Sequence, residues 1–348
     1  MKILYGVQGT GNGHIARARA MACALKKRDV DVDFLFSGRD ENKYFSMEEF
    51  GSYQTRKGVT FVTNKGKIDY FKTGLAAMPL EVIKEIRNID LSDYDLVLND
   101  FEPITAWAAK RQKIPCIGIS HQNAFRYTVP KKSNRWLDGK IIQHFAPSDF
   151  HIGLHWYHFG QPILPPIVHR NNGNTIEKGL DVLVYLPFEN VKDITDVLLG
   201  FTGTKFICYH PDISDESTVE NIQFKKTSHT EFQKDLHQCQ GVIANGGFEL
   251  PSEALSIGKK LLLKPLTGQF EQESNVATLE HLGLAHSMEY LDPTAIRDWL
   301  DVADAESITY PDVAQAIVDW VLEGCWTSSE TLGTELWQQV DFPSYTLI

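Results

Sequence analysis

Short apolar runs alternate with amphipathic stretches through the first half of the chain. Strands are expected at Lys2–Val7, Asp31–Phe36, Val59–Thr63, Asp95–Asn99 and Ile114–Ile119. Helices are expected from His14 to Lys27, over Leu80–Ile89 and over Ile104–Gln112. In the first of these helices the apolar stripe runs along Ile15, Ala18, Ala22 and Leu25, and Arg17 lies off it. Strands that alternate with helices predict a parallel, doubly wound sheet.

The pattern changes near residue 155 and then resumes. The aromatic run His155–Gly160 leads into several prolines and the polar run Asn171–Asn174, which predicts a linker. New strands are expected at Asp181–Leu186, Lys205–Tyr209, Asn221–Lys225, Gly241–Ala244 and Lys260–Leu266. Helices are expected over Val191–Leu199, Glu231–Cys239 and Val313–Glu323, the last capped by Asp312.

A second series of this kind predicts a second domain. We expect an α/β protein of two Rossmann-like, doubly wound parallel-sheet domains that face each other across a cleft. The expected divisions are residues 1–158, residues 159–312, and a tail of residues 313–348 that crosses back to the first domain. Because ligands bind at the carboxyl ends of such strands, the cleft is the expected site.

Composition places the chain among globular proteins, with 43% hydrophobic and 23% charged residues. Its first residues are apolar over too short a run for a signal peptide, so cytoplasmic residence is the default expectation. The cysteines show no C-x-x-C pair and are expected to be buried thiols. A net charge of −11 argues against nucleic acid as a partner.

Charge is distributed unevenly along the chain. Residues 1–150 hold 23 lysines and arginines against 17 acidic residues, whereas residues 151–348 hold 11 against 28. Two interpretations stay open. The halves differ only in how their surfaces are solvated, or the basic N-terminal domain contacts an anionic acceptor or the inner membrane face peripherally.

A glycine turn in the second half is the strongest local signal. The strand at Gly241–Ala244 runs into Asn245-Gly246-Gly247 and then a helix that carries Glu253. Free main-chain amides at such a helix start form a cradle for phosphate, and Glu253 lies within reach of a diol beside it. Gln272 and Asn275 share one face of the next helix. The alternative is an ordinary strand–helix unit with a tight turn and a surface glutamate.

A second glycine loop precedes His14. The spacing Gly9-x-Gly11-x-Gly13 is not the dinucleotide motif, and Ser37-Gly38-Arg39 lacks the acidic residue that holds an NAD ribose; only a remote NADP-type interpretation through Arg39 remains. A helix start disfavours the charged imidazolium, so His14 is expected to be neutral and able to take a proton. Capping or packing is the alternative. His121 and Asn123, after the neighbouring strand, are expected to line an acceptor pocket, with a turn-stabilising role as the alternative.

These motifs resemble those of GT-B glycosyltransferases. The run Ser252-Glu253-Ala254, followed by Gly258, Pro265, Gln272 and Asn275, is similar to the donor half of the peptidoglycan lipid-intermediate N-acetylglucosaminyltransferases (MurG-like) and of UDP-glycosyltransferases. The glycine loop before His14 resembles their N-terminal motif. Asp100, at the end of DLVLND, is similar to their base-orienting aspartate. Two departures are Leu250-Pro251, where the relatives place a threonine, and Leu186–Asn190, which lacks their Gly-Ser turn.

The resemblance implies a role for each matched residue. Glu253 would hold the ribose, and Glu271 and Gln272 would touch the donor sugar. The catalytic pair would be His14 and Asp100. The other donor-binding residues would be Gly11, Gly13, Phe224, Asn245, Gly246, Gly247, Phe248 and Asn275.

We therefore expect an inverting, metal-independent glycosyltransferase with no cofactor. Its partners would be a UDP-sugar donor and a sugar or lipid-linked acceptor. No Asp-x-Asp metal motif falls in the expected cleft loops. Glu249 and Glu253 share one helix face, which excludes a glycosidase pair acting from opposite sides of a bond. Two alternatives stay open: a UDP-sugar hydrolase of GT-B shape, whose N-terminus Gly13-His14-x-x-Arg17 also resembles, and a non-catalytic nucleotide-sugar sensor.

Overall fold

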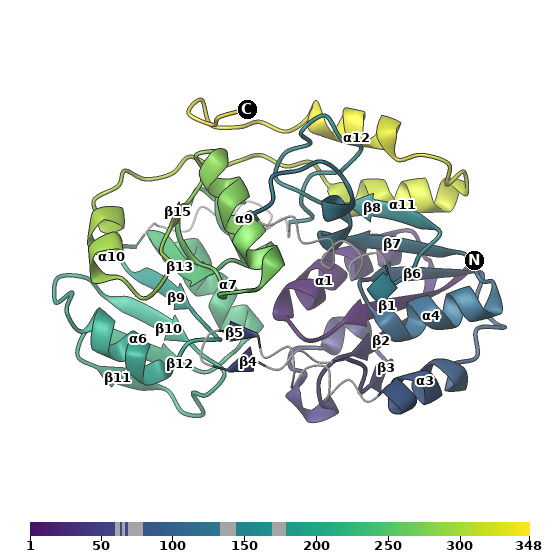
Figure 1. The fold of residues 1–348 in the computed structure, drawn as a ribbon, viewed down its shortest axis with the longest axis horizontal. Coiled ribbons are helices and arrows are strands. Elements are labelled where there is room, and N and C mark those ends of the chain that lie inside the picture. The colour runs from purple at the N-terminus through teal and green to yellow at the C-terminus, as the bar shows by residue number, and fades with distance from the viewer. Residues whose placement is uncertain (60–62, 65–66, 69–78, 133–143, 169–178) are drawn as a thin grey trace.

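The computed structural model describes residues 1–59, 63–64, 67–68, 79–132, 144–168 and 179–348 (Figure 1). Its first sheet has six parallel strands in the order β3-β2-β1-β6-β7-β8. These strands are β1 Lys2–Gln8, β2 Asp31–Ser37, β3 Tyr53–Arg56, β6 Leu96–Asp100, β7 Cys116–Ser120 and β8 Phe150–Gly153. The helices of this half are α1 Asn12–Lys27, α3 Pro79–Asn88 and α4 Pro103–Gln112, with a 3-10 helix at Gln122–Arg126. A separate two-stranded sheet pairs β4 Thr63–Asn64 with β5 Lys67–Ile68.

The second sheet has seven strands in the order β11-β12-β10-β9-β13-β14-β15. They are β9 Val182–Tyr185, β10 Phe206–Tyr209, β11 Ser217–Val219, β12 Ile222–Lys225, β13 Gly241–Asn245, β14 Lys260–Lys264 and β15 His286–Ser287. All pairings are parallel except that of the edge strand β11. The helices are α6 Val191–Leu198, α7 His229–Gln238, α8 Glu249–Ser256, α9 Phe270–His281 and α10 Pro293–Leu300. The predicted class, two doubly wound sheets, is confirmed.

The prediction for the third strand is wrong. The strand beside β2 is β3 at Tyr53–Arg56, whereas the predicted Val59–Thr63 reaches into residues outside the described part of the chain. Packing explains the choice, because Tyr53 meets the ring of Phe36 edge-on at 5.5 Å between centroids. A single aromatic anchor of this kind stabilises a short strand that the apolar pattern alone does not reveal.

The predicted linker is also corrected at its start. His155 and Trp156 are fully buried, and Leu154 pairs with Leu164 to extend the first sheet. Trp156 Nε1 donates a hydrogen bond of 2.9 Å to Ser252 Oγ in α8, so this aromatic segment is packed between the two halves. Residues 171–174 lie outside the described residues. The domain limits at 158 and 312 therefore stay a prediction.

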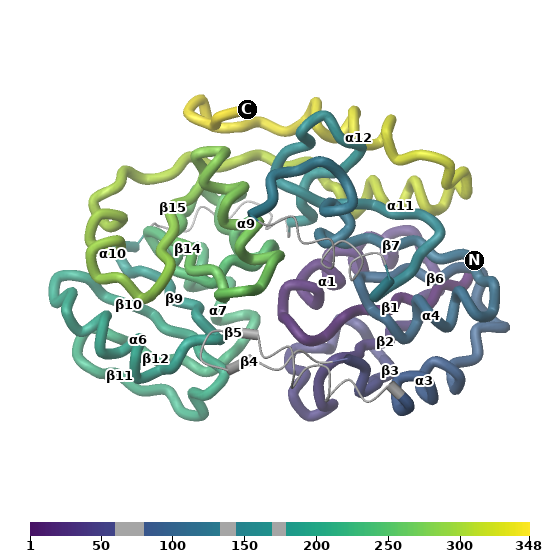
Figure 2. Tube along the Cα trace, in the orientation of Figure 1, coloured from purple at the N-terminus to yellow at the C-terminus, as the bar shows by residue number. Residues whose placement is uncertain are grey.

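The tail returns to the first sheet. Helix α11, Val313–Glu323, begins at Asp312, which accepts from the amide of Gln315 at 3.0 Å and confirms the predicted cap. α11 lies beside α1, where Arg28 donates to both carboxylate oxygens of Asp319 at 2.6 and 2.7 Å. Helix α12, Glu330–Trp337, then lies over the first half, and the chain ends near the second (Figure 2). The segment from α11 to the C-terminus thus contacts both halves, on the side of the molecule away from β4 and β5.

Other expectations concern cysteines and membrane spans. Cys116, Cys208 and Cys239 are buried free thiols as predicted, whereas Cys23 and Cys325 are exposed. Among the described residues, no helix has both the length and the apolar character to cross a membrane.

Candidate functional site

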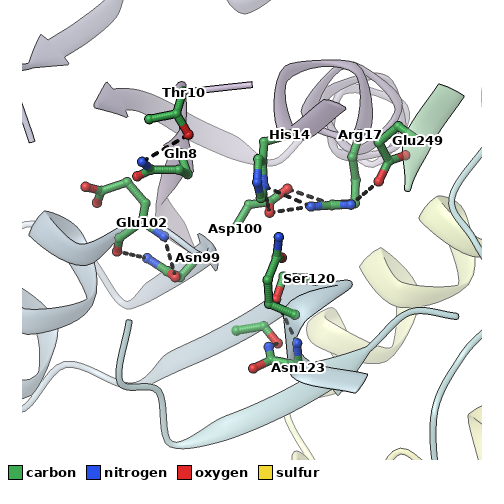
Figure 3. Close-up of polar contacts among 12 residues, drawn as sticks. Gln8, Thr10, His14, Arg17, Asn99, Asp100, Glu102, Ser120, Asn123 and Glu249 are labelled. Atoms are coloured by element: carbon green, nitrogen blue, oxygen red, sulfur yellow. Dashed lines mark hydrogen bonds and ion pairs between the residues drawn. The ribbon is translucent and has the colours of Figure 1, made fainter. Parts of the chain in front are cut away.

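His14 and Asp100 meet at the carboxyl edge of the first sheet. His14 lies in the first turn of α1, directly after β1, and Asp100 ends the neighbouring strand β6. His14 Nδ1 is 2.7 Å from Asp100 Oδ1 (Figure 3). Burial would raise the pKa of Asp100, but the charge of Arg17 and the hydrogen bonds from His14 and Arg17 outweigh it and lower that pKa. Asp100 is therefore a carboxylate, and the two residues predicted as a pair are brought together.

Nδ1 of His14 faces two groups, because it also lies 3.0 Å from Arg17 Nη2. The Asp100 carboxylate can only accept and is closer, at 2.7 Å, so we assign the proton of a neutral imidazole to Nδ1. The lone pair then lies on Nε2, for which no hydrogen bond is found among the described residues. The His14 side chain is 14% exposed and that of Asp100 is fully buried. The imidazole can thus accept a proton from a group in the cleft while Asp100 stabilises the imidazolium.

The turn after β6 is held by Glu102 rather than by Asp100. Phe101 adopts a left-handed conformation at φ 52°, and Glu102 follows as the N-cap of α4. Glu102 accepts from the amides of Ile104 and Thr105 at 2.8 and 2.6 Å. The alternative role of Asp100 as a helix cap is thereby excluded, and its carboxylate bonds His14 and Arg17 instead. Strained backbone next to a buried polar group is common at functional sites.

Arg17 is a site residue that the sequence interpretation missed. It was placed off the apolar stripe, yet its side chain is 2% exposed. Its Nε and Nη2 donate to the two oxygens of Asp100 at 2.7 and 2.6 Å, and its Nη1 donates to Glu249 Oε1 of α8 (Figure 3). The signal was available in part, because Arg17 follows His14 by three residues and so shares its helix face. Its second partner lies 232 positions away and could not be read from local pattern.

The glycine turn before α8 has the predicted form. A Cβ atom on Gly246 would lie 2.8 Å from the carbonyl oxygen of Gln272, so α9 packs directly on this glycine. A Cβ on Gly247 would meet nothing within 4 Å. Phe248, the N-cap of α8, makes no side-chain cap, and the amides of Phe248, Glu249 and Leu250 find no acceptor among the described residues. Unpaired donors at a helix start can bind an anion.

The predicted donor residues of α9 are occupied by protein contacts. Asn275 Nδ2 donates to the carbonyl oxygen of Gly246 at 3.0 Å, and Gln272 Oε1 accepts from the amide of Leu266 at 2.8 Å. Glu271 Oε2 accepts from Gln122 Nε2, across the cleft, at 3.0 Å. Asn245 Nδ2 donates to the carbonyl oxygen of Lys264 at 2.9 Å. These side chains hold the turn and the cleft walls, a positioning role rather than the predicted open face.

The predicted acceptor residues do not line an open pocket. His121 is buried, with Nδ1 2.8 Å from the carbonyl oxygen of Leu154 and Nε2 2.5 Å from Asn275 Oδ1. Its ring stacks on Phe248 at 3.9 Å between centroids. Asn123 Nδ2 donates to the carbonyl oxygen of Gly118 at 3.0 Å. Both residues therefore follow the packing and turn alternative, because buried polar groups at this interface find partners within the protein.

A pocket opens between α1 and the second sheet. It is lined by Gly13 of α1, by Tyr185 and Tyr209 at the strand ends, and by Phe232 and Glu253. Burial raises the pKa of Glu253, whose Oε2 accepts from Gln233 at 3.0 Å.

Two further residues predicted to bind the donor, Phe224 and Gly11, do not line this pocket. The Phe224 side chain lies in the core of the second half and does not line this pocket, and its donor-binding role stays a prediction. Thr227, Ser228 and His229, just after β12, line the pocket instead. Gly11 is the N-cap of α1, and a Cβ on it would meet nothing within 4 Å.

Comparison with known proteins identifies the family. A family model described as glycosyl transferase family 1 matches residues 1–303. The chain belongs to glycosyl transferase family 1. It is accordingly a glycosyltransferase, an enzyme that transfers a sugar to an acceptor. An uncharacterized glycosyltransferase of Methanosarcina mazei is 23% identical over 337 residues, 85% of this chain and 88% of the relative.

Solved glycosyltransferases share the fold of this family member. The SsfS6 glycosyltransferase of Streptomyces sp. SF2575, complexed with thymidine diphosphate, is 13% identical with a TM-score of 0.56, covering 97% of this chain and 99% of its own. MurG of Acinetobacter baumannii is 11% identical with a TM-score of 0.51, covering 97% and 100%. These likenesses show the GT-B fold, two Rossmann-like domains, as predicted.

Within this glycosyltransferase the glycine turn offers a matched pair of variants. Gly246→Ala is expected to lower the free energy of unfolding by about 1–3 kcal/mol, because the new methyl group overlaps α9. Gly247→Ala faces open space and is expected to leave stability unchanged. Urea denaturation measures the two free energies of unfolding. Equal stability of both variants would contradict the packing described here.

Proposed function

We propose that this glycosyltransferase transfers a sugar from a nucleotide sugar, foremost a UDP-sugar, to an acceptor hydroxyl, with inversion and without a metal ion. One observation carries the proposal: the His14–Asp100 pair lies beside the open helix start of α8. Arg17 bonds Asp100 and Glu249 at once, and a Cβ on Gly13 would lie 2.9 Å from Glu249 Cγ. A base and an anion site would thus face each other, in the two lobes that we place at residues 1–158 and 159–312.

The second lobe would bind the donor. Main-chain amides of Phe248, Glu249 and Leu250 would hold the diphosphate, where the helix dipole adds positive charge. Glu253 would hold the ribose hydroxyls, and the base would lie beside Thr227–His229 in the pocket described above. The thymidine diphosphate bound by SsfS6 supports a nucleoside diphosphate as the ligand.

The first lobe would supply the base. His14 Nε2 would take the proton of the acceptor hydroxyl while its oxygen bonds the anomeric carbon from the face opposite the diphosphate. The bond from that carbon to the diphosphate oxygen breaks, and the leaving charge is stabilised by the start of α8. Asp100 stabilises the imidazolium that forms. The acceptor would be a sugar or a lipid-linked glycan, reached from the basic first lobe.

Nucleotide binding is the first test. UDP, GDP and thymidine diphosphate are compared by thermal denaturation, since a ligand at 100 times its Kd stabilises the folded state by about 2.7 kcal/mol. We expect UDP to stabilise most. Failure of all three would overturn the proposal.

Turnover then separates transfer from its alternatives. UDP-sugars are incubated with and without sugar and lipid-linked acceptors, and released UDP is measured. Release that depends on an acceptor supports transfer. Rapid release without an acceptor would show a hydrolase. Binding without release under any condition would show a sensor.

A further inference from the structure

Glu249 is a buried acid that the proposed mechanism leaves unused. It is the first residue of α8, at the anion site, and its carboxyl group is directed at Arg17 in the opposite lobe (Figure 3). Its side chain is 7% exposed. Arg17 already bonds both oxygens of Asp100, so one guanidinium serves two buried carboxyl groups. When Asp100 and Glu249 are both ionised, the single positive charge of Arg17 balances only one of their two negative charges.

The ionisable groups around Glu249 come from four elements. They are Arg17 and His14 of α1, Asp100 of β6, Tyr5 of β1 and Glu253 of α8 itself. Only Arg17 is a fixed cation among these groups, so an ionised Glu249 leaves an excess negative charge at a largely buried position that borders the pocket. Burial raises the pKa of Glu249 to about 8, Arg17 opposes the rise, and Asp100 and Glu253 add to it.

A donor diphosphate would bring more negative charge to the same place. Its oxygens would bond the amides at the start of α8, adjacent to the Glu249 side chain. Two anions in one buried site repel, whereas a protonated carboxyl group can donate a hydrogen bond to a phosphate oxygen. Arg17 would keep its two bonds to Asp100 in either state.

We propose that a nucleoside diphosphate binds this site only when Glu249 carries a proton, so donor binding takes up a proton from solvent wherever Glu249 is ionised beforehand. The inference rests on the proposed donor site at α8. Since binding and protonation are linked reciprocally, raising the pH ionises Glu249 and lowers donor affinity. Affinity should fall up to tenfold for each pH unit above about 8.

Calorimetry with UDP and with thymidine diphosphate tests the linkage at pH 7, 8 and 9. Each titration is repeated in buffers of different ionisation enthalpy, which gives the number of protons taken up. In this range the terminal phosphate, with a second pKa of about 6, is ionised. For the wild-type protein we expect uptake to approach one proton at pH 9. For Glu249→Gln, which has no carboxyl group at this position, we expect no proton uptake there and a nucleotide affinity that does not change with pH. Glu253→Gln is the control: we expect weaker binding and a pH dependence displaced to lower pH, because Glu253 helps to raise the pKa of Glu249, but proton uptake on binding is retained.

The outcomes separate this inference from the proposed function. Equal proton uptake in the wild type and in Glu249→Gln would overturn the inference alone, as would nucleotide binding by the wild type without uptake at pH 9. Absence of binding by both nucleotides at every pH would overturn both. Should Glu249→Gln not fold, infrared difference spectra of the wild type decide. A newly protonated carboxyl band on UDP binding at pH 9 supports the inference, and its absence overturns it.

Discussion

Replacing His14 with alanine is expected to lower the rate of sugar transfer by about 10²–10⁴-fold while nucleotide binding is retained. The imidazole is the group whose Nε2 faces no described partner, and Nδ1 is fixed by Asp100 at 2.7 Å. The proposed donor contacts come from main-chain amides of α8 and from Glu253, so they survive the substitution. Asp100→Asn should give a loss of the same order, because an amide no longer stabilises the imidazolium.

The readouts are the transfer rate at saturating donor and the Kd for UDP by calorimetry. His286→Ala is the matched control, since His286 is exposed on the edge strand β15 and should change neither value. Transfer by His14→Ala at close to the wild-type rate would contradict the assignment. Lost UDP binding in this variant would show instead that His14 belongs to the donor site.

Replacing Arg17 with methionine is expected to lower the free energy of unfolding by about 3–5 kcal/mol. The change removes the only fixed cation from a site that holds two buried carboxyl groups, those of Asp100 and Glu249. Removing one partner of a buried ion pair leaves a buried charge without a partner, which destabilises the folded state strongly. The loss in Arg17→Met should therefore exceed the loss caused by replacing an arginine of an exposed ion pair. Adding Asp100→Asn should recover part of the stability, since it removes the ionised carboxylate that is left without its cation.

Urea denaturation measures each free energy of unfolding. Arg28→Met is the control, because Arg28 pairs with Asp319 at the surface and its side chain is 50% exposed. A loss in Arg17→Met no larger than that in Arg28→Met would contradict the network. Strict additivity of Arg17→Met and Asp100→Asn would show that the two residues do not interact.

Local pattern predicts most of the fold because most strands and helices here carry their own apolar periodicity. The strands β3, β8, β11 and β15 were not predicted; all are short, and β3 is stabilised by the Tyr53–Phe36 contact rather than by its own pattern. The predicted linker failed for a related reason. The aromatic residues His155 and Trp156 resemble an irregular connection in sequence, but tertiary packing buries them between the halves.

The site residues were predictable where the ends of neighbouring strands determine their positions. His14 follows β1 and Asp100 ends β6, and adjacency of these strands is enough to bring the side chains together. Contacts across the cleft were not predictable in this way. His121 and Asn275 were each expected to face a ligand, yet they bond each other at 2.5 Å. Arg17 and Glu249 form the same kind of link, which depends on how two distant segments meet.

A crystal structure of the protein with UDP tests the central claim most directly. The account predicts that the diphosphate bonds the amides of Phe248, Glu249 and Leu250, with the ribose on Glu253 and the terminal phosphate facing His14. A diphosphate bound elsewhere, or at α8 with His14 turned out of the crevice, would contradict the proposed site.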